Sequence, residues 1–186
     1  MTEPGYFDDL YARTADPWGL STSAYEARKY ALTVAALPHE RYQRCFEPGC
    51  AIGVLTALLA TRCDELVAWD GAPRALEQAR ARVDEPGVAF ALGRVPASWP
   101  RGRFDLVVVS ELLYFLGEAD RAGVRDMVCE SLLPDGHLVA VHWRHEFDEA
   151  STDGDAAHAE LDATPGLTNV LHAVETDFRL DVWARE

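Results

Sequence analysis

The chain has 186 residues, of which 48% are hydrophobic and 26% are charged, so one soluble domain with a sizeable buried core is expected. It contains 31 Asp and Glu residues against 17 Lys and Arg residues, which gives a formal net charge of −14 at pH 7. This balance argues against nucleic acid and anionic membranes as partners, because both are polyanions. The same balance is compatible with a neutral or cationic small substrate, although acidity alone more often serves solubility, and the oligomeric state is left open.

The sequence has no pattern typical of export. Met1–Gly5 lacks the basic and apolar regions of a signal peptide, and no uninterrupted apolar run reaches membrane-spanning length. The cysteines lack the spacing of a metal site, so we predict reduced thiols and no bound metal. A cytoplasmic location is therefore expected. The cysteines are Cys45, Cys50, Cys63 and Cys129.

The first part of the chain predicts two helices. Residues 6–13 form the first, and Asp16-Pro17-Trp18-Gly19 interrupts the pattern, as Pro and Gly do. Ser21 or Ser23 can cap the second helix, which stops before Pro38.

Strand and helix patterns then alternate. The apolar run Phe104–Ser110 is the strongest strand signal and is typical of a sheet buried on both faces. Such alternation predicts a doubly wound, Rossmann-like α/β sheet. The expected strands are 45–47, 66–70, 88–92, 104–110 and 138–141, and the expected helices are 52–61, 73–83 and 118–131, with a turn at Pro134-Asp135-Gly136.

The end of the chain breaks this alternation. Residues 167–174 and 178–184 are both strand-like, and only three residues separate them. So short a connection permits a hairpin but no parallel crossover, so we predict seven strands, mostly parallel, with an antiparallel C-terminal hairpin. The insertion before it should hold one helix, at 155–161. The whole is read as one domain, 1–186, with a helical lid (1–40), a cofactor-binding core (41–142), an acceptor-site insertion (143–166) and the hairpin (167–186).

A nucleoside pocket is predicted where the first two strands end. Residues 46–53, Phe-Glu-Pro-Gly-Cys-Ala-Ile-Gly, lead from an apolar strand through an acidic residue and a turn of small residues into a helix. The second strand ends in a lone Asp70. Open α/β sheets bind ligands at this carboxyl edge, where glycine lets the backbone approach a ligand and Asp70 can accept hydrogen bonds from ribose hydroxyls.

Two cofactors suit a sheet of this kind. A dinucleotide needs Gly-x-Gly-x-x-Gly around its pyrophosphate, but the spacing here is Gly49-x-Ala51-x-Gly53. Glu47, just before the turn, is also an unsuitable neighbour for a pyrophosphate. It suits a ligand that has an ammonium and a sulfonium, as S-adenosylmethionine does.

The same order of motifs resembles the class I S-adenosylmethionine-dependent methyltransferases over nearly the whole chain. It is more narrowly similar to the NodS-like (nodulation protein S) N-methyltransferases. This resemblance implies methyl transfer to a free amine, at the deacetylated glucosamine end of an oligosaccharide. The matching segments are Asp16-Pro17-Trp18-Gly19, Tyr25-Glu26-x-x-Lys29-Tyr30, Trp99-Pro100-x-Gly102-Arg103-Phe104-Asp105, Leu113-Tyr114-Phe115-Leu116, His142-Trp143-Arg144 and Gly154-Asp155-x-x-His158.

The predicted site residues follow from the strand ends and from these segments. Many relatives have an acidic residue after the third strand, whereas this chain has Arg94, which cannot accept the hydrogen bond of the adenine amine. The predicted cofactor contacts are Glu47, Gly49, Cys50, Ala51, Gly53, Asp70, Gly71, Arg94, Val95, Ser110 and Glu111. The predicted acceptor contacts are Tyr114, His142, Asp155, His158, Tyr30 and Trp18, and the candidate proton acceptors or orienting groups are His142, Glu111, His158 and Asp155.

Three other functions remain open on the sequence. The same scaffold could methylate a hydroxyl of a sugar or secondary metabolite. A nicotinamide-dependent oxidoreductase is disfavoured by the broken glycine spacing and the hairpin tail. A cofactor-binding module without catalytic activity would have the same donor motifs.

Overall fold

A sheet of seven strands, in the order β3-β2-β1-β4-β5-β7-β6, organises the part of the chain that the computed structural model describes, residues 5–186. Residues 1–4, on which the expectation about a signal peptide rests, lie outside the described residues. Strands β1 to β5 are parallel, and β7 is antiparallel to both β5 and β6. The strands are β1 (Tyr42–Pro48), β2 (Cys63–Asp70), β3 (Val88–Leu92), β4 (Phe104–Ser110), β5 (Leu132–Trp143), β6 (Leu167–Val174) and β7 (Phe178–Arg185).

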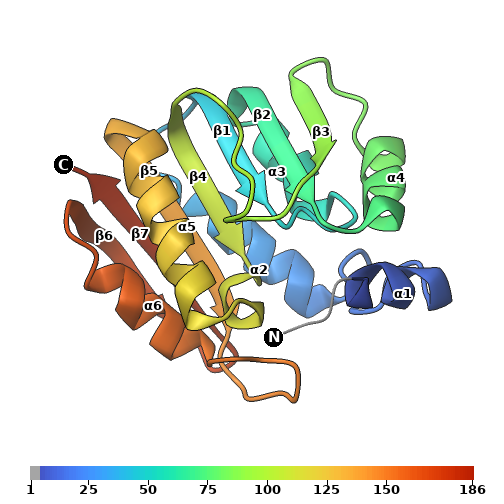
Figure 1. The fold of residues 1–186 in the computed structure, drawn as a ribbon. Helices are drawn as coiled ribbons and strands as arrows, with labels where there is room; N and C mark the ends of the chain where they lie inside the picture. The colour runs from blue at the N-terminus through green and yellow to red at the C-terminus, as the bar shows by residue number, and fades with distance from the viewer. Residues whose placement is uncertain (1–4) are drawn as a thin grey trace.

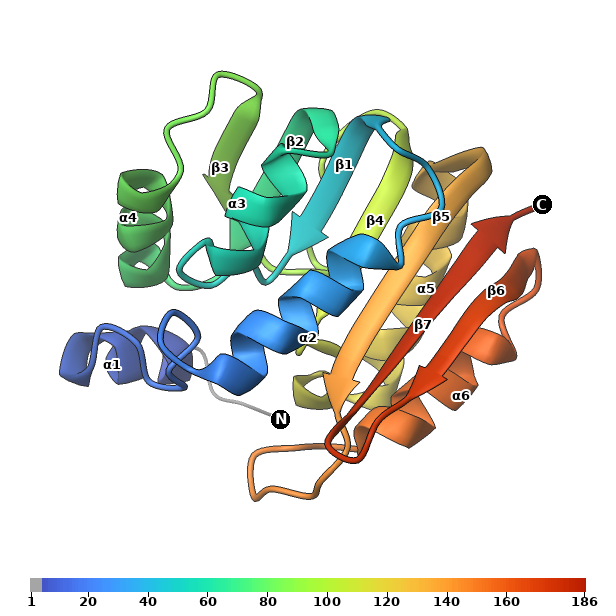
Figure 2. The same cartoon turned by 180° about the vertical axis from the view of Figure 1, so that it is seen from behind.

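Helices cover both faces of the sheet, as the two opposite views in Figures 1 and 2 show. Helices α5 and α6 lie in front of the sheet in Figure 1, while α2 and α3 lie in front of it in Figure 2. The arrowheads of β1, β4 and β5 point toward one edge, and α1 lies below that edge. The helices are α1 (Tyr6–Arg13), α2 (Ala24–Ala35), α3 (Val54–Ala60), α4 (Pro73–Arg82), η1 (Leu113–Phe115, a 3-10 turn), α5 (Glu118–Ser131) and α6 (Gly154–Asp162).

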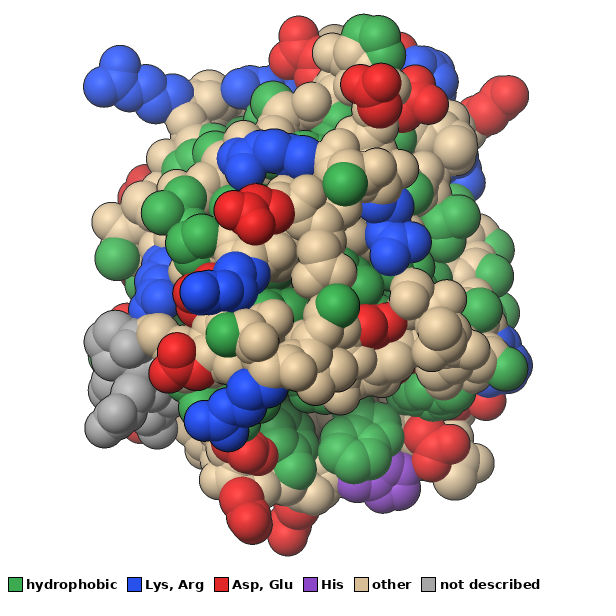
Figure 3. All heavy atoms as spheres, turned by 90° about the vertical axis from the view of Figure 1, so that its right-hand side faces the viewer, with side chains coloured by type: hydrophobic (Ala, Val, Ile, Leu, Met, Phe, Trp, Pro, Cys, Tyr) green, Lys and Arg blue, Asp and Glu red, His purple; other side chains and the backbone are tan. Residues whose placement is uncertain are grey.

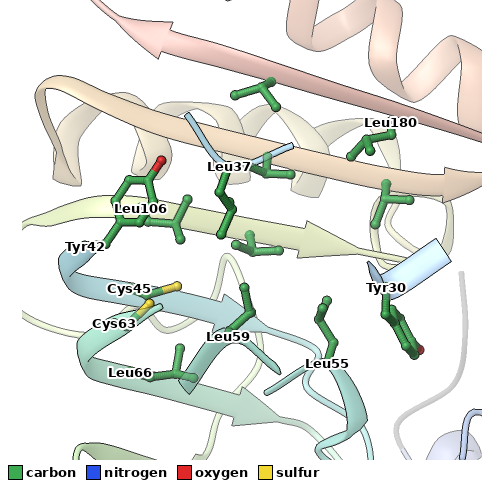
Figure 4. Packing of buried hydrophobic residues seen from close by; sticks show 14 of the residues in the cluster. Tyr30, Leu37, Tyr42, Cys45, Leu55, Leu59, Cys63, Leu66, Leu106 and Leu180 are labelled. Carbon is green, nitrogen blue, oxygen red and sulfur yellow. The ribbon is translucent and has the colours of Figure 1, made fainter. Parts of the chain in front are cut away.

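The side-chain alternation of β4 divides the core into two layers. Leu106 and Val108 pack toward α2 and α3, whereas Val107 and Val109 pack toward α5 and α6. In the first layer, Figure 4 shows the Cys45 and Cys63 thiols side by side, and both are free. No helix among the described residues is long and apolar enough to cross a membrane.

The predicted fold class is confirmed, including the antiparallel C-terminal hairpin. One local prediction is wrong: Pro134-Asp135-Gly136 is not a turn before β5 but a bulge inside it. The register with β4 jumps from Phe104↔Leu132 to Leu106↔His137, and Asp135 takes a positive φ of 59°. The strand therefore begins six residues earlier than its hydrophobic run indicates.

The turn that joins β1 to α3 depends on Gly53. This residue has a φ of +77°, and a Cβ added to it would lie 3.1 Å from the Cα of Ala79 on α4. Gly53 therefore lets α3 begin close against α4.

We predict that Gly53→Ala lowers the free energy of unfolding by about 1–3 kcal/mol, because alanine resists this left-handed conformation and crowds α4. Urea denaturation followed by tryptophan fluorescence measures the change. Ala51→Gly is the matched control, since Ala51 already has a φ of 49° and glycine relieves its strain. If Gly53→Ala unfolds at the same urea concentration as the wild type, the conformational and packing constraint assigned to Gly53 is wrong.

Candidate functional site

A cleft of about 640 Å³ runs along the carboxyl edge of the sheet. Its walls come from the ends of β1, β2, β4 and β5, from the segment after β3, and from the first two helices. Five segments that are far apart in the sequence thus contribute acidic side chains to one space. Those side chains, among the described residues, are Glu26, Glu47, Asp70, Glu111 and Asp120.

The turn after β1 is fixed to β2. The backbone amides of Gly49 and Cys50 both donate to the carbonyl of Trp69, at 2.7 and 2.9 Å. Gly49 has a φ of +75°, and a Cβ there would lie 3.3 Å from Leu112. This glycine is needed both for the turn and for its close approach to the segment after β4.

The Asp70 carboxylate is oriented by backbone amides. Its Oδ2 accepts from the amide of Ala51 at 2.9 Å and its Oδ1 from the amide of Ala72 at 2.8 Å. Burial raises the pKa of Asp70, although the amides and Arg94 act in the opposite direction. Each carboxylate oxygen has a second lone pair, so Asp70 can accept further hydrogen bonds from a ligand in the cleft.

Arg94 lies beside this carboxylate at the same end of the cleft. Its Nη2 donates to the carbonyl of Gly71 at 3.4 Å. Trp18 packs on Tyr11 there, with ring centroids 5.7 Å apart, and burial together with the charge of Asp70 raises the pKa of Tyr11. Trp18 also lies 6.2 Å from the ring of Phe7, which packs on Phe115, so Trp18 lines the cleft between Tyr11 and Phe7, and its contact with an acceptor stays a prediction.

Glu47 is the most deeply buried carboxyl of the cleft, with 2% of its surface exposed. Burial, and to a smaller extent the charge of Asp70, raise its pKa to about 8, while the hydroxyl of Thr56, donating at 2.7 Å, acts against that rise. The side chain therefore holds a proton at neutral pH. A cation in the cleft would favour its ionised form.

A buried lysine joins two carboxylates at the other end of the cleft. Lys29 on α2, whose side chain is 1% exposed, places its Nζ 3.0 Å from Oε1 of Glu26 and also bonds Glu111 directly after β4. Glu111 additionally accepts from the hydroxyl of Tyr114 and, at 2.9 Å, from the amide of Trp143. With two carboxylates for one ammonium, this cluster has a net negative charge.

The hydroxyl of Tyr25 completes this end. It is buried and has no hydrogen-bond partner among the described residues, although its side chain lines the cleft. A buried polar atom without a partner is costly, so this hydroxyl is suited to bond a ligand. Tyr30 lies nearby at the end of the hydrophobic cluster drawn in Figure 4 and lines the cleft as well.

The structure brings nearly all the predicted cofactor contacts together. Gly53 is the exception, because its place is the contact between α3 and α4. The residues that line the cleft are Glu47, Gly49, Cys50, Ala51, Asp70, Gly71, Arg94, Val95, Ser110 and Glu111, with Tyr114, Tyr30 and Trp18 from the predicted acceptor contacts.

Three predicted acceptor or catalytic residues are not in the lining. His142 and His158 are fully buried, and Asp155 forms an ion pair with Arg144 at 2.8 Å. Adjacent strand residues point to opposite faces, and Trp143 is the one that reaches the cleft, so His142 points away from it. A direct contact of these three side chains with an acceptor is not supported by this geometry.

Glu26 and Trp143 line the cleft although neither was predicted as a site residue, and the pairing of Lys29 with carboxylates was not predicted. The available signal was the spacing of Glu26 and Lys29, which puts both on one face of α2. No local pattern indicated that Lys29 would meet Glu111, 82 positions further along the chain.

The geometry agrees with the comparisons to known proteins. A family model described as nodulation protein S (NodS) matches residues 8–163. Nodulation protein S of Rhizobium tropici is 32% identical over 127 residues, which are 67% of this chain and 53% of that protein, so the chain spans about half the length of this relative.

Two solved structures extend the comparison. A Pseudomonas syringae protein, provisionally classed as a methyltransferase, is 45% identical, with a TM-score of 0.78 over 88% of this chain and 100% of its own. N-methyltransferase NodS from Bradyrhizobium japonicum WM9, in complex with S-adenosyl-L-homocysteine, has a TM-score of 0.79 over 96% of this chain and 97% of its own. Its identity is 24%, and the likeness shows the shared class I methyltransferase fold.

We predict that Lys29→Met lowers the free energy of unfolding by about 3–5 kcal/mol, because the variant leaves the carboxylates of Glu26 and Glu111 without their shared cation. Chemical denaturation measures the loss. The neighbouring Arg28→Met is the control, since Arg28 is 55% exposed in its pair with Glu175 and its loss should cost no more than about 1 kcal/mol. Equal losses in the two variants would contradict a special role for the buried cluster.

Proposed function

This chain belongs to the nodulation protein S family, and on that premise we propose that it transfers a methyl group from S-adenosylmethionine to the amine nitrogen of a small molecule or amino sugar. The observation that supports this most is the row of acidic side chains along the cleft. Asp70 lies at one end, Glu47 is buried between the ends, and Glu111 lies at the other. Such a cleft attracts cationic ligands and repels the pyrophosphate of a dinucleotide.

The donor half of the cleft suits S-adenosylmethionine. When bound, this cofactor supplies a methyl group activated by a sulfonium. Asp70 would accept hydrogen bonds from the ribose hydroxyls with the lone pairs that its backbone amides leave free. Glu47 would face the cationic methionine portion. Arg94 has no acceptor atom, so a backbone carbonyl or another side chain would accept the hydrogen bond of the adenine amine.

The acceptor half suits an amine. The net negative charge of Glu26, Lys29 and Glu111 favours an ammonium, which must lose a proton before its nitrogen can attack a methyl group. Glu26 and Glu111 are the carboxylates of that cluster that line the cleft, and the unpartnered Tyr25 hydroxyl can orient the acceptor. Alignment of this kind can lower a barrier by about 7–11 kcal/mol. The name N-methyltransferase of the Bradyrhizobium japonicum relative supports the same acceptor class.

The N-terminal segment is proposed as a lid over this cleft. Phe7 on α1 packs its ring 5.0 Å from that of Phe115 in η1, and Tyr6 donates to Glu149 at 2.8 Å. These contacts link α1 to the acceptor side, while the pair of Asp8 with Arg74 links it to α4. Closing the cleft would exclude water from methyl transfer. The division of the chain into lid, core, insertion and hairpin belongs to this proposal.

The surface charge and the free thiols support the proposed partner class and location. On the face in Figure 3, Lys and Arg side chains are interspersed with Asp and Glu and form no single basic patch, which fits a small-molecule partner better than nucleic acid. The free thiols of Cys45 and Cys63 fit a reducing, cytoplasmic location.

Transfer of a labelled methyl group tests the reaction. The purified protein is given S-adenosylmethionine with chitosan oligosaccharides that have a free terminal amine, and with their fully N-acetylated counterparts. We expect label only on the free amine. Label on the acetylated sugars would identify a hydroxyl acceptor instead. Tight binding of a nicotinamide cofactor without binding of S-adenosylmethionine would overturn the proposal. Binding of S-adenosylmethionine without turnover on any amine would identify a cofactor-binding module without catalytic activity.

Asp70→Ala should weaken binding of S-adenosylhomocysteine by about 1–3 kcal/mol, because the hydrogen bonds to the ribose are lost. Isothermal titration calorimetry measures the change. Asp64→Ala is the control, since Asp64 lies on the same strand at the opposite edge and is exposed in its pair with Arg41. An unchanged dissociation constant for Asp70→Ala would remove this residue from the donor site.

Binding of S-adenosylmethionine should strengthen as the pH rises from about 6 to 8. Glu47, with a pKa of about 8 in the free protein, must release its proton to face the cation, and fewer molecules hold that proton at higher pH. Calorimetry in buffers of different ionisation enthalpy should detect proton release. Glu47→Gln should remove this part of the pH dependence, and proton release unchanged in that variant would contradict the assignment.

A further inference from the structure

Three consecutive residues at the end of β5 hold the turn that follows β4. The carbonyl of Val141 accepts from the amide of Glu111 at 2.9 Å, and the amide of Trp143 donates to Oε2 of Glu111 at 2.9 Å. Between them, Nε2 of His142 accepts from the amides of residues 112 and 113, at 3.3 and 3.1 Å. Glu111 has a positive φ of 52°, so this turn is strained and depends on these bonds.

The hydrogen bonds of His142 determine which ring nitrogens have a proton in a series of three hydrogen-bonded side chains, His142, His158 and Asp181. Because Nε2 accepts two amides, it has no proton, so Nδ1 has it and donates to Nε2 of His158 at 3.0 Å. Nδ1 of His158 in turn donates to Oδ2 of Asp181 on β7 at 2.6 Å. Both imidazoles are therefore neutral and each has its proton on Nδ1.

This series of hydrogen bonds ends at the carboxylate of Asp181. Asp181 is fully buried and also accepts from Nδ1 of His172 at 2.5 Å and from Nε of Arg179 at 2.6 Å. Burial raises its pKa, but the hydrogen bonds from His158, His172 and Arg179 outweigh that effect and lower it. For His142, burial and the neighbouring His158 and Lys29 hold the pKa well below its usual value, which keeps Nε2 free to accept.

The first turn of α6 packs closely against the end of β5. A Cβ on Gly154 would lie 2.4 Å from the carbonyl oxygen of Trp143, so only glycine fits there. Asp153 caps α6 by accepting from the amide of Ala156, and Arg144 bonds Asp155. These contacts fix the end of α6 against β5 and bring His158 to His142.

We propose that His142 and His158 are positioning residues, which act from outside the cleft by holding the turn at residues 111–114. The chain from Asp181 through both imidazoles keeps an acceptor aimed at the amides of residues 112 and 113. The turn thereby presents Glu111 and Tyr114 at the acceptor end. This inference rests on the proposed function for its effect on catalysis, whereas the tautomers and the restraint on the turn can be tested without turnover.

Kinetics of two substitutions at one position test the effect on catalysis. His142→Leu removes the acceptor, and we expect kcat/KM for the amine acceptor to fall at least about tenfold, since small displacements of a catalytic group can cost about 100-fold. The dissociation constant of S-adenosylhomocysteine should change less than about twofold. His142→Gln restores an acceptor atom near the position of Nε2 and should recover most of the lost activity.

His137→Leu is the matched control. His137 lies on the same strand, is buried, and bonds the hydroxyl of Tyr42 at 3.1 Å, but it lies five residues before His142 and does not line the cleft. Its loss should lower stability without changing kcat/KM. Equal kinetic losses in His137→Leu and His142→Leu would overturn the positioning role.

Nitrogen-15 NMR of the wild type tests the proposed tautomers and hydrogen bonds of His142 and His158 without any variant. We expect both histidines to be neutral Nδ1–H tautomers at pH 7, with slow hydrogen exchange at the amides of residues 112 and 113. A proton on Nε2 of His142 would overturn the inference whether or not the protein transfers methyl groups. If these signatures hold and no acceptor is methylated, the proposed function fails and the restraint on the turn stands.

Discussion

The full or partial burial of carboxylates at the ends of three parallel strands is the constraint on which the rest of this structure depends. Glu47, Asp70 and Glu111 follow or end β1, β2 and β4, and all three line one cleft. Burial of a negative charge is unfavourable unless it is paired, hydrogen-bonded or removed by protonation. The protein uses each of these means at a different position.

The carboxyl groups at the donor end and at the acceptor end of the cleft are stabilised in different ways. Glu47 holds a proton and Asp70 accepts backbone amides, so both retain capacity for an arriving ligand. Glu111 is already bonded by Lys29, Tyr114 and the amide of Trp143, so it is fixed in orientation before any acceptor binds. The donor end thus responds to a cation, whereas the acceptor end is organised in advance. Helix α2 contributes to this organisation, because Glu26 and Tyr30 line the cleft and the buried Lys29 behind them bonds Glu111.

Two segments that carry the family resemblance are two sides of one contact. His142-Trp143-Arg144 ends β5, and Gly154-Asp155-x-x-His158 begins α6. Gly154 packs on Trp143, Asp155 bonds Arg144, and His158 bonds His142. Their residue types suggest acid–base chemistry, yet their partners are one another. Their proposed influence on the cleft is indirect, through the backbone of the turn after β4.

The sequence by itself determined the order of the elements, the closing hairpin and the edge at which Glu47, Asp70, Ser110 and Glu111 meet, because hydrophobic periodicity and the rule for parallel strands are local or follow from topology. Only the tertiary structure decided the pairing of Lys29 with Glu111, the bulge in β5 and the face taken by His142. Strand alternation states that His142 and Trp143 point to opposite faces, but not which of them reaches the cleft. That choice depends on how α2 and α6 pack on the two faces of the sheet, and packing between distant segments leaves no periodic trace in the chain.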